Sequence, residues 1–217
     1  VENVQEDSLK EGNVRNLKSI VLQPRFLQAI TAAAFAYAVM SFLMTATPLS
    51  MHVMENMSLK ETGLVLQFHV VAMFLPSLIT GNLIKKYGHS AIIYGGVLFF
   101  FITVLLSLFE QTYLNYMLSL IFLGLGWNFL FISGTSLVVL TYNKGEKFKV
   151  QGINDLIVFS TMALASLSAG ILLNSIGWKM MNLICIPFLI LIIFVSYMAD
   201  KKSCLLYTSD AADENPS

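Results

Sequence analysis

Long apolar runs constrain this chain more than any other feature of its sequence. A helix that crosses a lipid bilayer needs about 20 predominantly apolar residues, because its backbone finds no water to bond with there. Hydrophobic residues make up 56% of the chain and charged residues only 12%, against about 25% charged residues in an ordinary soluble domain. The sequence therefore predicts an all-α membrane protein with six transmembrane helices, at Phe26–Pro48, Thr62–Ile84, Ala91–Phe109, Tyr113–Leu140, Gln151–Ile176 and Met181–Met198.

The distribution of basic residues supports this count of six. If both termini and every second loop lie on one side, only Lys60 and Lys179 of the 13 Lys and Arg residues fall on the other side. Cytoplasmic loops carry the excess of basic residues in membrane proteins, so both termini are predicted to be cytoplasmic. The formal net charge of +0 gives no indication of a nucleic-acid partner, and the predicted surroundings are the lipid bilayer.

One ionisable side chain stands inside the second predicted helix. His69 shares a helical face with Pro76 and Thr80, by the three- and four-residue spacing of an α-helix. An ionisable group within the membrane is costly and by default marks a substrate contact or a proton pathway. The alternative is a neutral histidine that bonds to a neighbouring helix.

Polar side chains on the first and fourth predicted helices extend this candidate pathway. Tyr37, Ser41 and Thr45 recur every four residues, which places them on one helical face. That face lines an aqueous cavity or forms a slightly polar helix contact. Asn128 lies in the middle of the fourth helix, where its amide bonds either a substrate or a neighbouring helix. Both pairs of alternatives stay open at this point.

A single carboxylate lies near the start of the fifth predicted helix, at Asp155. The helix dipole stabilises a negative charge at this end. Because Asp155 is close to the membrane surface, the sequence favours a structural role, such as pairing with a nearby lysine in a gate, over proton transfer.

The order of polar and apolar helices repeats along the chain. The third and sixth predicted helices are apolar almost all round, and such helices face lipid or are wholly buried. This pattern is typical of two three-helix repeats that surround a site near the middle of the membrane. The first, second, fourth and fifth helices are then predicted to line the cavity.

The two ends of the chain differ from the apolar middle. Residues 1–23 are polar and mixed in charge and are predicted to form a cytoplasmic linker, part of a central loop, ahead of a bundle at residues 24–202. The segment CLLYTSDAADE, from Cys204 to Glu214, reads as the translation of a transposase adapter used in preparing sequencing libraries. Residues 203–217 are therefore predicted to be disordered and foreign to the fold.

Motifs of other function classes are missing from the sequence. It contains no HExxH or GxSxG motif and no Gly-rich loop ending in Lys-Ser/Thr, and its three histidines are spread along the chain. We therefore predict no enzyme activity, no metal site and no cofactor. A non-transporting scaffold or sensor subunit, the alternative from another class, would need a sizeable soluble module that these 217 residues do not encode.

The loop after the second predicted helix carries a family resemblance. GNLIKKYGH, Gly81 to His89, resembles the loop signature of major facilitator superfamily (MFS) transporters, in the copy between the eighth and ninth of the usual twelve helices. Gly81, Lys86 and Gly88 match its glycine and basic positions, whereas Lys85 stands where the signature often has Asp. The segments TATPLSM, QFHVVAMFLPSLITGNLI, GLGWNFLFISGTSLVV and VQGINDLIVF resemble a bacterial subgroup of these permeases.

This resemblance covers about Pro24 to Lys202 and implies the carboxy-terminal six-helix half of an MFS fold, whose partner is the amino-terminal half of the same transporter. It implies secondary active transport of a small molecule across the bacterial inner (cytoplasmic) membrane by alternating access. Proton coupling is one option, and a dimer of six-helix halves is an alternative. It also implies a cytoplasmic gating element formed by Gly81, Lys85, Lys86 and Gly88.

Two observations bear on the predicted substrate. Polar groups at mid-membrane are few, which favours an amphipathic or aromatic solute over a highly charged one. Riboflavin-like vitamins are a candidate that the resemblance alone suggests.

Overall fold

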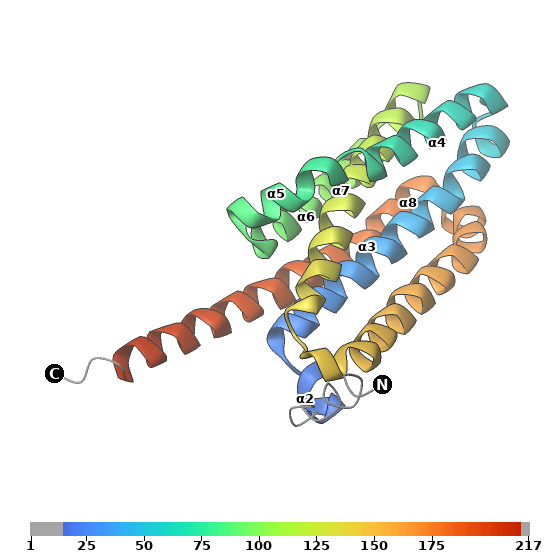
Figure 1. The fold of residues 1–217 in the computed structure, drawn as a ribbon. Coiled ribbons are helices and arrows are strands. Elements are labelled where there is room, and N and C mark those ends of the chain that lie inside the picture. Colours follow the sequence, from blue (N-terminus) through green and yellow to red (C-terminus); the bar gives the residue numbers. More distant parts are fainter. Residues whose placement is uncertain (1–14, 214–217) are drawn as a thin grey trace, which may run out of the picture.

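Long helices that follow the predicted apolar runs make up the structure (Figure 1). The computed structural model describes residues 15–213, with side chains described for residues 15–204, and it shows no strand in that part of the chain. The elements in chain order are α2 (Leu17–Val21), α3 (Pro24–Pro48), η2 (Leu49–Met54), α4 (Leu59–Phe74), α5 (Ser77–Tyr87), α6 (His89–Ser107), α7 (Tyr113–Val139), η3 (Lys144–Glu146) and α8 (Lys147–Asp213).

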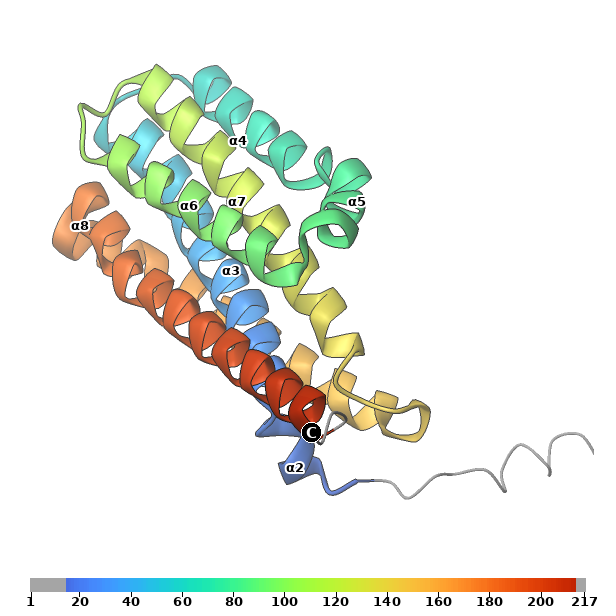
Figure 2. The same ribbon diagram turned by 90° about the vertical axis from the view of Figure 1, so that its left-hand side faces the viewer.

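Helix α8 reverses direction once, at a non-helical residue between two helical arms. Gly177 has φ 76° and ψ 170°, a backbone conformation that glycine adopts readily because it has no Cβ. The residues before Gly177, here called the first arm, and those after it, the second arm, form a hairpin whose arms both lie beside α3 (Figures 1 and 2). The predicted fifth and sixth helices correspond to these two arms.

The second predicted helix is broken in the structure. α4 and α5 meet at an angle of 40° across Leu75 and Pro76, because proline lacks the N–H that would continue the helical bonds. The helix also begins at Leu59, before the predicted Thr62. Ser58 and Glu61 form a reciprocal capping box there, which stabilises an earlier first turn.

Four helices are long and apolar enough to cross a membrane among the residues described, or five if the bent α4–α5 pair counts as one span. They are Pro24–Met54, which includes η2, then His89–Ser107, Tyr113–Val139 and Lys144–Cys204, which includes the reversal at Gly177. The chain is therefore a multi-pass, all-α membrane protein.

Helix α7 packs closely against three neighbours through its glycines. A Cβ atom added at Gly124 would lie 2.7 Å from the carbonyl oxygen of His69 in α4, and one at Gly134 would lie 2.7 Å from that of Ala29 in α3. A Cβ atom added at Gly126 would lie 2.9 Å from the carbonyl oxygen of Gly96 in α6. Small residues let membrane helices approach to backbone contact, so these three positions set how α3, α4 and α6 are arranged around α7.

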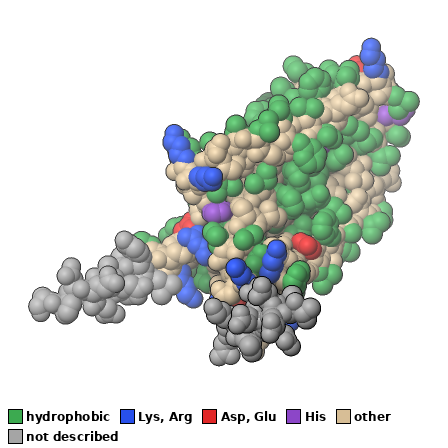
Figure 3. Space-filling view, in the orientation of Figure 1, with side chains coloured by type: hydrophobic (Ala, Val, Ile, Leu, Met, Phe, Trp, Pro, Cys, Tyr) green, Lys and Arg blue, Asp and Glu red, His purple; other side chains and the backbone are tan. Residues whose placement is uncertain are grey.

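Apolar side chains cover much of the outer surface. In the space-filling view they spread over the middle of the bundle, and charged side chains lie mostly towards its ends (Figure 3). Leu98 and Leu105 of α6 are 59% and 58% exposed, and Ile190 and Phe194 of the second arm 55% and 59%. A soluble monomer rarely exposes so much contiguous apolar surface, and lipid is the environment that fits it.

Helical segments lie within the parts of the predicted linker and tail that the structure describes. Ile20 of α2 is buried at 1% exposure, so the predicted solvated linker does not describe residues 15–23. Its apolar residues, Leu17 and Val21 among them, pack on the core. Helix α8 runs on to Asp213, and the predicted disorder and foreign origin of residues 203–217 stay predictions. Residues 1–14 and 214–217, parts of the predicted linker and tail, lie outside the described residues.

Candidate substrate-binding site

His69 is fully buried between α4 and α7. Its Nδ1 lies 2.7 Å from the carbonyl oxygen of Leu120 in α7, and because a carbonyl only accepts, Nδ1 carries the hydrogen of this bond. In the neutral ring Nε2 is then the basic atom, and it is buried without a hydrogen-bond partner among the described residues. One nitrogen of His69 thus bonds a neighbouring helix, which is the second of the two alternatives. The role of His69 as a substrate contact or proton carrier stays a prediction.

Asn128 of α7 holds the break between α4 and α5. Its Nδ2 donates to the carbonyl oxygen of Met73 and to Oγ of Ser77, both at 2.7 Å, while Thr80 Oγ1 donates to its Oδ1 at 2.7 Å. Pro76 stands between these partners, and one amide therefore satisfies backbone and side-chain groups that the broken helix leaves unpaired. This arrangement is the helix-bonding alternative, and the substrate-contact role stays a prediction.

Replacing Asn128 by alanine is expected to destabilise the protein by about 1 to 2 kcal/mol, because the Met73 carbonyl of α4 and the Thr80 hydroxyl of α5 lose the partner that α7 provides. Thermal unfolding in detergent measures this effect. Asn182→Ala is the matched control, since the buried Asn182 amide donates only to Trp178 of its own helix. Equal stability losses in the two variants would contradict a special role of Asn128 at the break.

The predicted polar face of α3 lies against α8. Thr45 Oγ1 is 3.0 Å from Ser166 Oγ in the first arm, and the Tyr37 ring contacts Phe159 in that arm and Trp127 of α7. Ser41 is half-buried on the same face. The structure therefore brings these three residues to the contact between α3 and the first arm, and does not place them in bonding contact with His69 or Asn128. Their role in lining a pathway stays a prediction.

The predicted gating element forms the exposed end of α5. Gly81, Lys85 and Lys86 lie on its last turns, and Gly88, with φ 83°, ends it. The two lysines are exposed, and Lys86 Nζ lies 5.0 Å from the centre of the Tyr87 ring. This end of α5 is free of tertiary ion pairs in the described part of the chain, and its gating role stays a prediction.

Asp155 is exposed in the first arm, and its Oδ1 accepts from Nδ2 of the adjacent Asn154 at 3.0 Å. It forms no ion pair with a lysine or arginine between residues 15 and 204. The lysine contact suggested for a gate is therefore not formed within the described residues.

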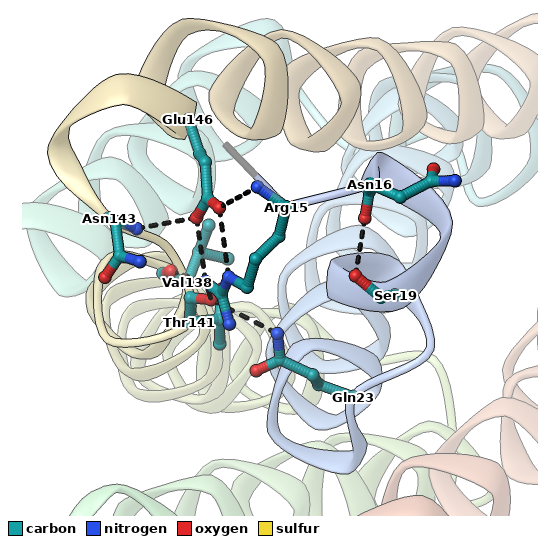
Figure 4. Close-up of polar contacts among 8 residues, drawn as sticks. All are labelled: Arg15, Asn16, Ser19, Gln23, Val138, Thr141, Asn143 and Glu146. Carbon is teal, nitrogen blue, oxygen red and sulfur yellow. Dashed lines mark hydrogen bonds and ion pairs between the residues drawn. The ribbon is translucent and has the colours of Figure 1, made fainter. Parts of the chain in front are cut away.

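The sequence reasoning missed a polar cluster that docks the segment before the bundle. Arg15 donates through Nη2 to Glu146 Oε2 at 2.7 Å and to the carbonyl oxygen of Thr141 at 3.0 Å, and Gln23 Nε2 donates to the same carbonyl (Figure 4). The hydrogen bond to the carboxylate of Glu146 raises the pKa of Arg15 above its usual value. Arg15 and Glu146 are 131 residues apart, so no local pattern indicates their contact.

A second cluster ties three helix ends together. Arg25 Nη1 of α3 lies 2.7 Å from Asp200 Oδ1 of the second arm, and Ser90 Oγ of α6 donates to the same oxygen at 2.6 Å. Gln28 Nε2 donates to Ser90 Oγ at 2.9 Å. This cluster lies at the end of the bundle that the basic residues predict to be cytoplasmic. Arg25 and Asp200 are 175 residues apart in sequence. The one sequence signal for their contact is the acidic Asp200 next to Lys201 and Lys202 at the end of an apolar run.

Groups of three or more His, Cys, Asp or Glu side chains that could hold a metal ion do not occur among the described residues. The candidate residues are thus one histidine, one amide, hydroxyl groups and an aromatic ring.

Comparisons with known proteins place these features in a family. The model of the Major Facilitator Superfamily matches residues 16–212. The riboflavin transporter RfnT of Brucella anthropi is 39% identical over 179 residues, which cover 82% of this chain and 45% of that protein. Two uncharacterized MFS-type transporters of Bacillus subtilis are also similar. YdeG is 31% identical over a match that covers 71% of this chain and 36% of YdeG. YddS is 32% identical over a match that covers 71% of this chain and 37% of YddS.

The chain spans less than half the length of these curated relatives, between 36% and 45%. The family model nonetheless covers nearly all the described residues, including the α4–α5 break, the end of α5 and both arms of α8. The chain belongs to the Major Facilitator Superfamily.

Proposed function

We propose that this chain is the carboxy-terminal half of a secondary transporter that moves a small molecule across the bacterial inner membrane by alternating access. The observation that carries the proposal is the broken α4–α5 span. Its bend of 40° is held by Asn128 of α7, and the unpaired Nε2 of His69 lies about two turns before it. Discontinuous helices near the middle of the membrane form the substrate and ion sites of many transporters.

The proposed topology has six crossings. α3, the α4–α5 pair, α6, α7 and the two arms of α8 each cross once, so that both termini are cytoplasmic. The support for this count is the separation of basic residues, since only Lys60 and Lys179 of the 13 lie on the outer side. The two three-helix repeats then place α6 and the second arm at the lipid-facing positions, which fits their exposed apolar side chains.

We propose that transport needs an amino-terminal six-helix half, with which the chain forms a cavity between α3, the α4–α5 pair, α7 and the first arm. The support is the relatives' length, of which this chain matches no more than 45%. Alternating access then consists of rocking the two halves about the shared cavity.

The proposed substrate is riboflavin or a vitamin of similar chemistry. The support is the 39% identity to a protein named as a riboflavin transporter, together with the small number of charged groups within the spans. A mostly neutral cavity suits a neutral, amphipathic aromatic molecule.

Uptake by the intact protein tests this function. The full-length gene product is reconstituted into proteoliposomes that are preloaded with unlabelled riboflavin, and the entry of labelled riboflavin by exchange is followed. We expect saturable exchange that excess unlabelled riboflavin in the outside solution suppresses, in contrast to empty liposomes. Exchange no faster than in empty liposomes would refute the flavin substrate. A panel of other labelled vitamins in the same vesicles then decides whether transport itself fails.

A further inference from the structure

Five aromatic side chains from four helices form a cluster that the sequence analysis did not identify as a unit. Trp127 and Phe131 of α7 stack with ring centres 4.9 Å apart and an interplanar angle of 13°. The Tyr37 ring meets both edge-on, at 5.3 and 5.0 Å. Phe159 of the first arm lies 6.0 Å from Tyr37, and Phe74 of α4 lies 5.8 Å from Trp127. This set is here called the aromatic cluster.

Tyr37 and Trp127, the two rings of the aromatic cluster with a polar group, lie at an unusual depth within the membrane-spanning helices. Tyr37 lies near the middle of α3, Trp127 near the middle of α7, and Phe74 at the break within the α4–α5 pair. Tyr and Trp in membrane proteins gather at the two interfaces, where the polar tip meets water or headgroups. A Tyr–Trp pair at mid-membrane lacks that explanation.

The aromatic cluster is neither a closed core nor fully satisfied in hydrogen bonding. Phe74 and Phe159 are 58% and 50% exposed, so ring surface remains open beside Trp127, which Phe74 contacts, and beside Tyr37, which Phe159 contacts. Trp127 Nε1 is buried without a partner, and the Tyr37 hydroxyl makes no hydrogen bond with a described residue. An unpaired donor away from water costs free energy, and an acceptor on a bound molecule would remove that cost at the half-buried Tyr37 hydroxyl.

A second group of rings shows what an ordinary aromatic contact looks like in this protein. Phe99 of α6 meets Phe122 and Phe129 of α7 at 5.9 and 5.3 Å. This group contains only phenylalanine and therefore has no donor to satisfy. The aromatic cluster differs from it in having two donors and in drawing its rings from the four elements proposed to line the cavity.

We propose that the aromatic cluster is the subsite that stacks a planar heteroaromatic ring of the substrate. The open faces of Phe74 and Phe159 contact the ring, and the half-buried Tyr37 donates its hydroxyl hydrogen to a ring carbonyl or ring nitrogen. The buried Trp127 supports Tyr37 from behind. Offset or edge-to-face contacts with such a ring add affinity beyond apolar burial. This inference rests on the transport function proposed above, because it needs the cavity between the two halves.

Binding of riboflavin to variants of the full-length protein tests the subsite. Phe159→Leu keeps an apolar side chain but removes the ring, and Tyr37→Phe keeps the ring but removes the hydroxyl. Each is expected to raise the Kd for riboflavin by about 2- to 12-fold. Phe129→Leu, in the phenylalanine group on α6 and α7, is the matched control and is expected to leave the Kd within about twofold of the wild-type value. Thermal unfolding of each variant shows that it is folded.

The outcomes separate the two proposals. If the wild type binds riboflavin and the Phe159 and Tyr37 variants bind it as tightly, the subsite is wrong while the transport proposal stands. A Phe129 variant that loses as much affinity as they do would also overturn the subsite, because the effect would then be general. If the wild type does not bind riboflavin, the flavin substrate is wrong, and the subsite proposed for it is wrong as well.

Discussion

A His69→Gln protein is expected to insert and fold normally but to lose the pH dependence of substrate uptake. The glutamine amide can still donate to the Leu120 carbonyl that now accepts from Nδ1 at 2.7 Å, so the contact between α4 and α7 is kept. It offers no basic nitrogen in place of Nε2, and helix α7, against which His69 packs, carries no charged residue. A proton that enters at His69 therefore has no alternative acceptor on α7.

Uptake into proteoliposomes over a range of external pH measures this effect, with membrane insertion and the unfolding temperature as controls of folding. His52→Gln is the matched control, because His52 Nδ1 makes the same kind of bond, to the Met57 carbonyl at 2.7 Å, but is exposed near the end of η2. We expect its pH profile to follow the wild type. A His69→Gln protein whose uptake keeps the wild-type pH profile would remove His69 from the coupling mechanism.

Replacing Gly124 by alanine is expected to lower stability by about 3 kcal/mol, at the upper end of overpacking effects. The added Cβ would lie 2.7 Å from the His69 carbonyl oxygen and 3.0 Å from the Met73 nitrogen. Both are backbone atoms, so no side-chain rotation relieves the contact and α4 must move away from α7. For a chain of this size the loss corresponds to a fall in the unfolding temperature of about 6 to 12 °C.

Thermal unfolding in detergent, followed by loss of the monodisperse peak in size-exclusion chromatography, checks this prediction. Gly63→Ala on α4 is the control, because nothing lies within 4 Å of a Cβ built there and alanine favours a helix over glycine. We expect that variant to be as stable as the wild type or more so. If the Gly124 variant unfolds at the same temperature as the Gly63 variant, the close approach of α4 and α7 is not important for stability.

Several elements of the fold follow from sequence patterns that act locally. An apolar run long enough to cross a bilayer must be helical, since only a helix or a closed barrel satisfies its backbone in lipid. This is why α3, α6 and α7 lie close to their predicted bounds. The reversal of α8 at Gly177 directly follows the predicted helix end at Ile176, whereas α5 runs three residues past the predicted end at Ile84 before Gly88 ends it. Both glycines have a positive φ, a backbone conformation suited to glycine.

Other features depend on contacts between residues far apart in sequence. The break at Pro76 was visible only as a proline within an apolar run, and its consequence depends on Asn128, which reaches it from another helix. The ion pairs of Arg15 and Arg25 join residues more than a hundred positions apart. The five rings of the aromatic cluster come from four helices, and no period in the sequence connects them.

The sequence by itself determined that this protein is a bundle of membrane helices with a resemblance to one transporter family, and which polar side chains stand within the apolar runs. It did so because the bilayer restricts backbone structure to a few forms that a local pattern reveals. Only the tertiary structure decided what those side chains bond to. The amide of Asn128 turned out to hold a broken helix, and one nitrogen of His69 to hold α7, because such contacts depend on how closely the glycines of α7 let its neighbours approach.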